Sequence, residues 1–106
     1  IDEVVSAIKL GDAPRTSKYF DNMVEISINE KSHSYSKSQA EMVLRDFFSN
    51  KGVKNFKVAH RGNTNDSEYC VGILSTESGD FRTTIFMKVR GDRKVINSLI
   101  FDGASR

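Results

Sequence analysis

Cysteine, proline and tryptophan are nearly absent from this chain of 106 residues, which contains one Cys, one Pro and no Trp. A single cysteine cannot form an internal disulfide, so the sequence is not that of a small disulfide-stapled domain. One proline and seven glycines also exclude collagen-like and low-complexity chains. No apolar run approaches the roughly 20 residues that a membrane-spanning helix needs, so we expect no membrane span.

A strong net charge is absent as well, because 16 basic and 14 acidic residues give a formal charge of +2. Basic residues gather only at Lys88, Arg90, Arg93 and Lys94, around a predicted hairpin. That group lacks the density and the aromatic neighbours of a nucleic-acid site, so we expect no nucleic-acid partner. The length is too short for two independent cores, which indicates a single domain over residues 1–106.

The clearest local pattern predicts a helix over residues 37–51. Ser36 and Gln39 have the spacing of a capping box, in which a serine hydroxyl and a glutamine side chain satisfy each other's backbone amides. Apolar residues then recur with helical spacing at Ala40, Val43, Leu44, Phe47 and Phe48. Gly52 suits the left-handed conformation that ends many helices.

Two short helices are predicted before this one, the second capped by Asp12 and running to Phe20. Alternating apolar residues predict strands over 24–28, 56–61, 69–74, 81–90 and 94–101. Residues 30–35 are polar and indicate a connection. Helices followed by a run of hairpins predict an α+β fold with a mostly antiparallel sheet, one face of which packs on the long helix.

Several segments also resemble a known family. They are Tyr35-Ser36-Lys37-Ser38-Gln39-Ala40-Glu41, Phe56-Lys57-Val58-Ala59-His60-Arg61-Gly62 and Tyr69-Cys70-Val71-Gly72-Ile73-Leu74. With the order of elements, they make the chain similar to small exported bacterial proteins of uncharacterised function within the nuclear transport factor 2-like (NTF2-like, or cystatin-like) superfamily. The resemblance implies a cone, in which N-terminal helices and one long helix pack on a curved sheet. It implies no activity and no cofactor.

The same resemblance implies export, to the periplasm or the cell exterior. The chain begins at Ile1 rather than at Met, which suggests either a removed leader or an artificial boundary.

Enzymes of this superfamily, such as the ketosteroid isomerases, need a carboxylate or similar base inside the cone. The strand residues that we assign to the inner face include no acid: Phe56, Val58, Phe81, Thr83, Ile85, Met87 and Val89. His60 shares the face of Phe56 and could act as a base, but the sequence names no group to orient it, so a core-edge histidine is favoured. His33, His60 and Cys70 lack metal-ligand spacing, so we predict no metal.

We predict that six residues line the interior of the cone: Tyr19, Phe47, Phe56, His60, Tyr69 and Met87. Four apolar residues are predicted on the outer sheet face: Leu74, Phe86, Ile96 and Ile100. Apolar side chains on a face that should meet water indicate a second layer, and we expect a homodimer there.

The leading interpretation is a non-enzymatic binding or interaction protein, whose cone either holds a small apolar ligand or is filled. The alternative is an isomerase- or hydrolase-type enzyme that uses His60 with Tyr19 or Tyr69. A third interpretation is an accessory domain of a larger assembly.

Overall fold

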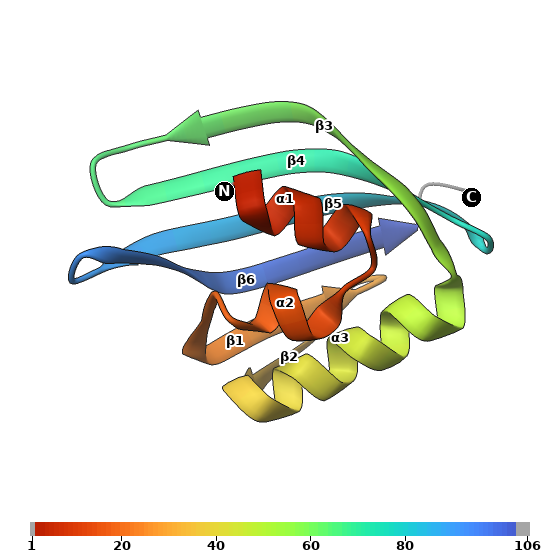
Figure 1. The fold of residues 1–106 in the computed structure, drawn as a ribbon, viewed down its shortest axis with the longest axis horizontal. Coiled ribbons are helices and arrows are strands. Elements are labelled where there is room, and N and C mark those ends of the chain that lie inside the picture. The colour runs from red at the N-terminus through yellow and green to blue at the C-terminus, as the bar shows by residue number, and fades with distance from the viewer. Residues whose placement is uncertain (1, 104–106) are drawn as a thin grey trace.

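The computed structural model describes residues 2–103, in which three helices and six strands follow one another (Figure 1). The elements are α1 (Asp2–Lys9), α2 (Ala13–Ser17), β1 (Phe20–Ile28), β2 (Lys31–Ser36), α3 (Lys37–Lys51), β3 (Val53–Asn63), β4 (Ser67–Thr76), β5 (Gly79–Arg90) and β6 (Arg93–Gly103).

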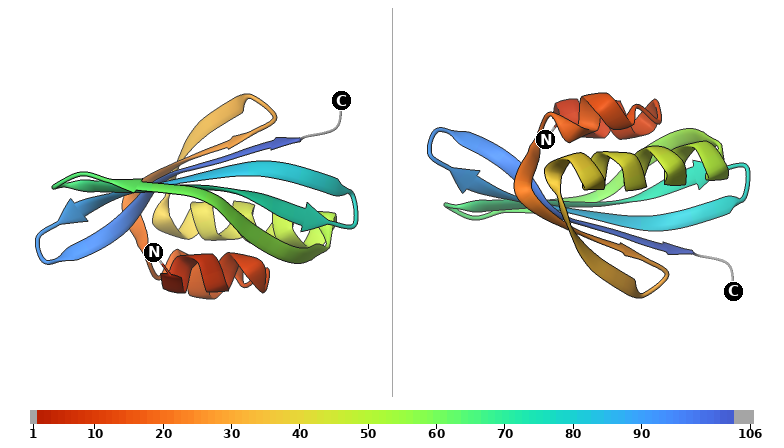
Figure 2. Two further views of the ribbon diagram at one scale, coloured as in Figure 1. Left: turned by 90° about the horizontal axis from the view of Figure 1, so that it is seen from above. Right: turned by 90° about the horizontal axis from the view of Figure 1, so that it is seen from below.

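The six strands form one sheet in the order β2-β1-β6-β5-β4-β3. Only β1 and β6 pair in parallel, and the other neighbours are antiparallel. Figure 2 shows α1, α2 and α3 on the same side of this sheet. We call the side that faces the helices the inner face, and the opposite side the outer face.

The long helix has the predicted bounds because its two ends are specified by local chemistry. Ser36 Oγ accepts a hydrogen bond from the Gln39 amide at 3.4 Å, and Gln39 Oε1 accepts one from the Ser36 amide. Gly52 follows the last turn with φ +70°, and its amide donates to Phe48 O at 3.0 Å. The predicted capping box and glycine stop are therefore confirmed.

The prediction that residues 30–35 form a polar connection is wrong. They form most of the edge strand β2, which pairs antiparallel with β1 and is joined to it by the two-residue turn Asn29-Glu30. Polar residues suit this strand because most of it is exposed, so no apolar alternation marks it in the sequence. Helix α2 is also shorter than predicted, since Phe20 already begins β1 and is buried.

Aromatic side chains from α3, β5 and β6 fill the space between the helices and the inner face. The ring of Phe47 lies 4.6 Å from that of Phe101 and 5.2 Å from that of Phe81, centroid to centroid. Leu44, Ile85 and Leu99 in the same cluster are completely buried. This part of the cone is thus packed with side chains.

Two irregularities in the sheet reverse predicted side-chain directions. In β3, Val58 lies opposite Gly72 but His60 lies opposite Val71, so Ala59 is an extra residue. His60 is therefore exposed on the outer face, and its predicted place inside the cone is wrong. In β6, Asn97 is the extra residue, and it turns Ile96 into the core, where it is fully buried.

The alternation along β4 has the phase opposite to the one predicted. Cys70 and Leu74 are fully buried on the inner face, and Leu74 lies opposite Phe81. Tyr69 lies opposite Phe86 and is half-buried on the outer face. Leu74 and Ile96 are thus not outer-face residues, and Tyr69 is not an interior one, because every second residue of a strand points to the same side.

Candidate functional site

Apolar and aromatic side chains gather on the outer face of β3, β4, β5 and β6. We call this group the outer patch: His60, Tyr69, Val71, Ile73, Phe86 and Ile100. Strand pairing makes them neighbours, since the register aligns His60, Val71, Thr84 and Ile100 in one row across the four strands. None of the three helices in residues 2–103 lies on this side of the sheet (Figure 2).

Three rings cross the outer patch side by side. The His60 and Tyr69 ring centroids are 5.8 Å apart, and those of Tyr69 and Phe86 are 6.4 Å apart. Phe86 remains 39% exposed. A Cβ atom at Gly62 would lie 2.3 Å from a ring carbon of Tyr69, so the absence of a side chain at Gly62 lets that ring lie across β3.

Charged side chains border the outer patch. One border is a cross-strand row that consists of three charged residues and one residue of the patch: Lys57, Ile73, Arg82 and Asp102. A further charged residue, Lys88, lies two positions after Phe86 in β5. An apolar centre with a polar rim is the arrangement of many protein interfaces. This surface can bury rings against a partner.

Of the residues predicted to line the cone, three are core residues in the structure. Phe47, Phe56 and Met87 are all at most 6% exposed. Met87 also borders a surface pocket of about 490 Å³, together with Tyr19 and Val4. There the hydroxyl of Tyr19 donates a hydrogen bond to Glu3, and that bond raises the pKa of Tyr19 above its ordinary value. The structure thus brings Tyr19 and Met87 together, but places His60 and Tyr69 on the opposite face.

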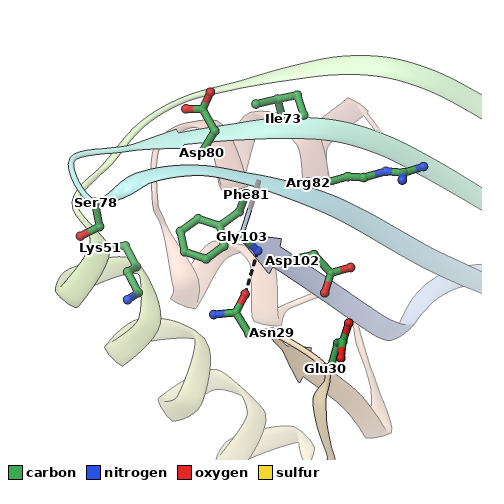
Figure 3. Close-up of a pocket in the computed structure, with 10 residues that line it drawn as sticks. All are labelled: Asn29, Glu30, Lys51, Ile73, Ser78, Asp80, Phe81, Arg82, Asp102 and Gly103. Carbon is green, nitrogen blue, oxygen red and sulfur yellow. Dashed lines mark hydrogen bonds between the residues drawn. The ribbon is translucent and has the colours of Figure 1, made fainter. Parts of the chain in front are cut away.

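A larger pocket, of about 800 Å³, lies where β5, β6 and the β1–β2 turn approach the end of α3 (Figure 3). The Nζ atom of Lys51 lies 5.8 Å from the centroid of the Phe81 ring. Asn29 Oδ1 accepts a hydrogen bond from the Gly103 amide at 2.7 Å, which ties the turn to β6. The sequence does not predict this pocket, because residues 30–35 read as a polar connection and the β1–β2 turn at Asn29 and Glu30 is therefore not expected.

A third pocket, of about 510 Å³, separates the edge strand β2 from α3. It is lined by His33, Ser34, Tyr35, Gln39, Met42, Val43 and Asp46. Met42 is 54% exposed there, although it is a large apolar residue.

Cys70 has the properties of a structural residue, because it is fully buried and burial raises the pKa of its thiol. Among residues 2–103, no three His, Cys, Asp or Glu side chains are grouped as a metal site would need. Within the same residues, no helix is long and apolar enough to cross a membrane.

A family profile described as Domain of unknown function (DUF4783) matches residues 1–102. The chain is 32% identical to a DUF4783 family protein from Bacteroides uniformis, and the two structures agree with a TM-score of 0.96 over 99% of this chain and 97% of that one. Among proteins with curated annotation, none matches.

Two less similar structures show the fold. An NTF2-like protein of unknown function from Cytophaga hutchinsonii has a TM-score of 0.67 at 11% identity, over 94% of this chain and 84% of that one. A domain of unknown function with a cystatin-like fold from Nostoc punctiforme has a TM-score of 0.76 at 12% identity, over 99% and 73%. The predicted α+β, NTF2-like fold and the resemblance to a family of uncharacterised function are confirmed.

Proposed function

The chain belongs to the DUF4783 family, whose function is unknown, and we propose that it is a non-enzymatic interaction domain that forms a homodimer through the outer face of its sheet. The observation that carries this proposal is the outer patch. It combines three neighbouring rings with Val71, Ile73 and Ile100 on a face that the helices leave uncovered.

The size of the outer face supports a dimer. Stable interfaces bury roughly 600–1,000 Å² on each partner. Strands β3 to β6 have ten to twelve residues each, and at about 3.3 Å per residue and 4.8 Å per strand their common face covers roughly 700 Å². A partner that covers this face therefore has enough area for a standard interface.

A second copy is the partner that the chemistry favours. Two-fold symmetry would bring the same apolar centre from each copy together, since such interfaces are self-complementary. The cross-strand row at the border carries both signs of charge, with Lys57 on β3, Arg82 on β5 and Asp102 at its β6 end, so two copies can pair opposite charges at the rim.

The enzyme alternative, and a ligand inside the cone as part of the leading interpretation, have less support. An isomerase- or hydrolase-type enzyme that uses His60 with a tyrosine requires both groups inside the cone, whereas His60 and Tyr69 lie on the outer face. A small apolar ligand inside the cone would need space that Phe47, Phe81 and Phe101 occupy. Export stays a prediction from the family resemblance, and fractionation of the native bacterial cells tests it.

Sedimentation velocity at increasing protein concentration tests the dimer. We expect a monomer–dimer equilibrium, and we expect Phe86→Lys to weaken it by at least about 30-fold, since central aromatic residues contribute about 2 kcal/mol or more to an interface. Leu10→Lys is the matched control, because Leu10 is 67% exposed in the turn directly after α1, away from the outer face. A monomer at all concentrations, or a dimer insensitive to Phe86→Lys, would contradict the proposal.

A further inference from the structure

The sheet has a free edge at β2. This strand is the last in the sheet order, and among residues 2–103 it pairs only with β1, in an unbroken antiparallel register from Lys31 to Ser36. Its other side therefore presents unpaired backbone amides and carbonyls at alternate residues. Residues 31–34 are exposed, so the backbone there is accessible.

The opposite edge of the sheet is better protected than β2, which has no bulge and a single lysine, Lys31. Strand β3 contains the bulge at Ala59, and its lysines Lys54 and Lys57 are exposed. Arg61 of β3 also forms an ion pair with Asp2 of α1 at 2.8 Å. Bulges and charges are common means by which proteins prevent strand addition, so β2 is the edge more open to a new strand.

Helix α3 provides a side wall next to the β2 edge. Gln39, Met42, Val43 and Asp46 occupy one stripe of the helix, adjacent to the stripe that is buried in the core. They line the pocket of about 510 Å³ that His33, Ser34 and Tyr35 of β2 close on the other side. Figure 2 shows that β2 and α3 are close where one leads into the other and diverge toward the β1–β2 turn.

We propose that this groove binds an extended peptide segment of a partner protein, which adds to the free edge of β2 as a seventh strand. An added strand would lie about 4.8 Å beyond β2, and its alternate side chains would point toward the α3 stripe. The β2 backbone would form hydrogen bonds with the peptide backbone, whatever the sequence of the peptide. The α3 stripe would determine which peptide side chains are preferred. This site is separate from the outer patch and does not depend on the proposed dimer.

The lining of the groove specifies the chemistry of the peptide. Met42 and Val43 offer apolar contact in the middle of the stripe, and Met42 is 54% exposed without a partner peptide. Asp46 is exposed and makes no ion pair with any residue from 2 to 103. The expected segment therefore has an apolar residue facing Met42 and a basic residue two positions away, where both side chains lie on the same side of the strand.

A second copy of this chain fits the groove less well. Antiparallel pairing of two β2 strands about a two-fold axis would place both α3 helices on the same side, where they would compete for the space over the new strands. The structure thus favours a heterologous peptide at this edge.

The test begins with a library of random linear peptides displayed on phage and selected on the intact chain. We expect enrichment of sequences with an apolar and a basic residue two positions apart. A synthetic peptide of the enriched sequence should perturb the NMR amide signals of residues 31–36 and the methyl signal of Met42. N-methylation of its backbone should weaken binding at alternate positions only, because just those amides would pair with β2.

Two methionines of equal exposure provide matched variants. Met42→Glu places a charge against the apolar residue of the peptide, and we expect the affinity to fall at least about tenfold, since an unpaired charge is costly to bury. Met23→Glu changes a methionine that is also 54% exposed but lies on β1 outside the groove, and it should leave the affinity unchanged.

Several results would overturn the proposal. They are an absence of enrichment over the bare support, NMR perturbations outside β2 and α3, and an N-methylation profile without a two-residue period. A peptide affinity that is unchanged in Met42→Glu would also overturn the proposal. A disulfide between two copies that carry Ser34→Cys, formed in place of peptide binding, would show that the edge pairs with a second copy instead.

Discussion

Small residues decide where the large rings of this sheet can lie. A Cβ atom at Gly72 would lie 2.5 Å from the backbone oxygen of Lys57 and 2.9 Å from ring carbons of Phe56, and one at Gly62 would meet the ring of Tyr69 on the outer face. Each glycine thus allows a ring to lie across a neighbouring strand. A single sequence does not reveal this function, since glycine in a strand is usually only a weak position.

The β1–β2 turn contains a residue in an unfavourable conformation. Glu30 has φ +73° and follows Asn29 at φ +51°. Two positive φ values are typical of the type I′ hairpin turn, for which Asn-Gly is the preferred sequence. A glutamate in the left-handed region costs about 1 kcal/mol, so we expect Glu30→Gly to raise the free energy of unfolding by about 0.5–1 kcal/mol. Urea denaturation measures the change.

The β5–β6 turn allows the opposite substitution, in which a glycine at positive φ is replaced. Gly91 has φ +66° in open space, so Gly91→Ala should lower the stability by a similar amount through the backbone alone. If Glu30→Gly proved destabilising while Gly91→Ala behaved as expected, contacts of the Glu30 side chain at its pocket would outweigh the backbone strain.

Elements that are specified by their own residues could be predicted from the sequence. Elements that are specified by pairing with another strand could not. Ser36, Gln39 and Gly52 specify both ends of α3 from within the helix itself. Strand β2 has no such signal, because only pairing with β1 makes Lys31–Ser36 extended. The extra residues Ala59 and Asn97 are likewise defined by the opposite strand, and each reverses the direction of the side chains beyond it.

The start of α3 makes an element-scale prediction. Ser36→Ala removes the hydroxyl that accepts from the Gln39 amide, and we expect the free energy of unfolding to fall by about 1 kcal/mol. Ser38→Ala is the control, because Ser38 is an exposed residue of the first turn with no capping role. Equal losses in the two variants, measured by urea denaturation, would mean that the capping box contributes nothing specific.

At the scale of the whole fold, helices cover the inner face of the sheet, and none of the elements in residues 2–103 covers the outer face. The sequence of β5 predicts that both faces of the sheet carry large side chains. The predicted alternation of β5 agrees with the structure, in which every second residue from Phe81 to Met87 is buried. The composition of the outer patch was not predictable from the sequence. His60 lies in it because of the bulge at Ala59, and Tyr69 lies in it because the alternation of β4 has the phase opposite to the predicted one. Candidate sites in such a sheet therefore depend on register.

The packed interior leads to the last prediction. Phe47 is 6% exposed and contacts the rings of Phe81 and Phe101, so Phe47→Ala should cost about 3–5 kcal/mol and leave an apolar cavity. Phe86→Ala on the outer face is the control, and in dilute protein it should cost less than about 1 kcal/mol.

A dry apolar cavity of this kind binds small hydrocarbons, so benzene should raise the melting temperature of Phe47→Ala and leave that of the natural chain unchanged. The milder Phe47→Leu serves if the alanine variant does not fold, and it should respond to benzene in the same direction but less. Stabilisation of the natural chain by benzene would show that the cone already contains a ligand-sized cavity. The interior of the cone would then be a candidate ligand-binding site in addition to the outer face.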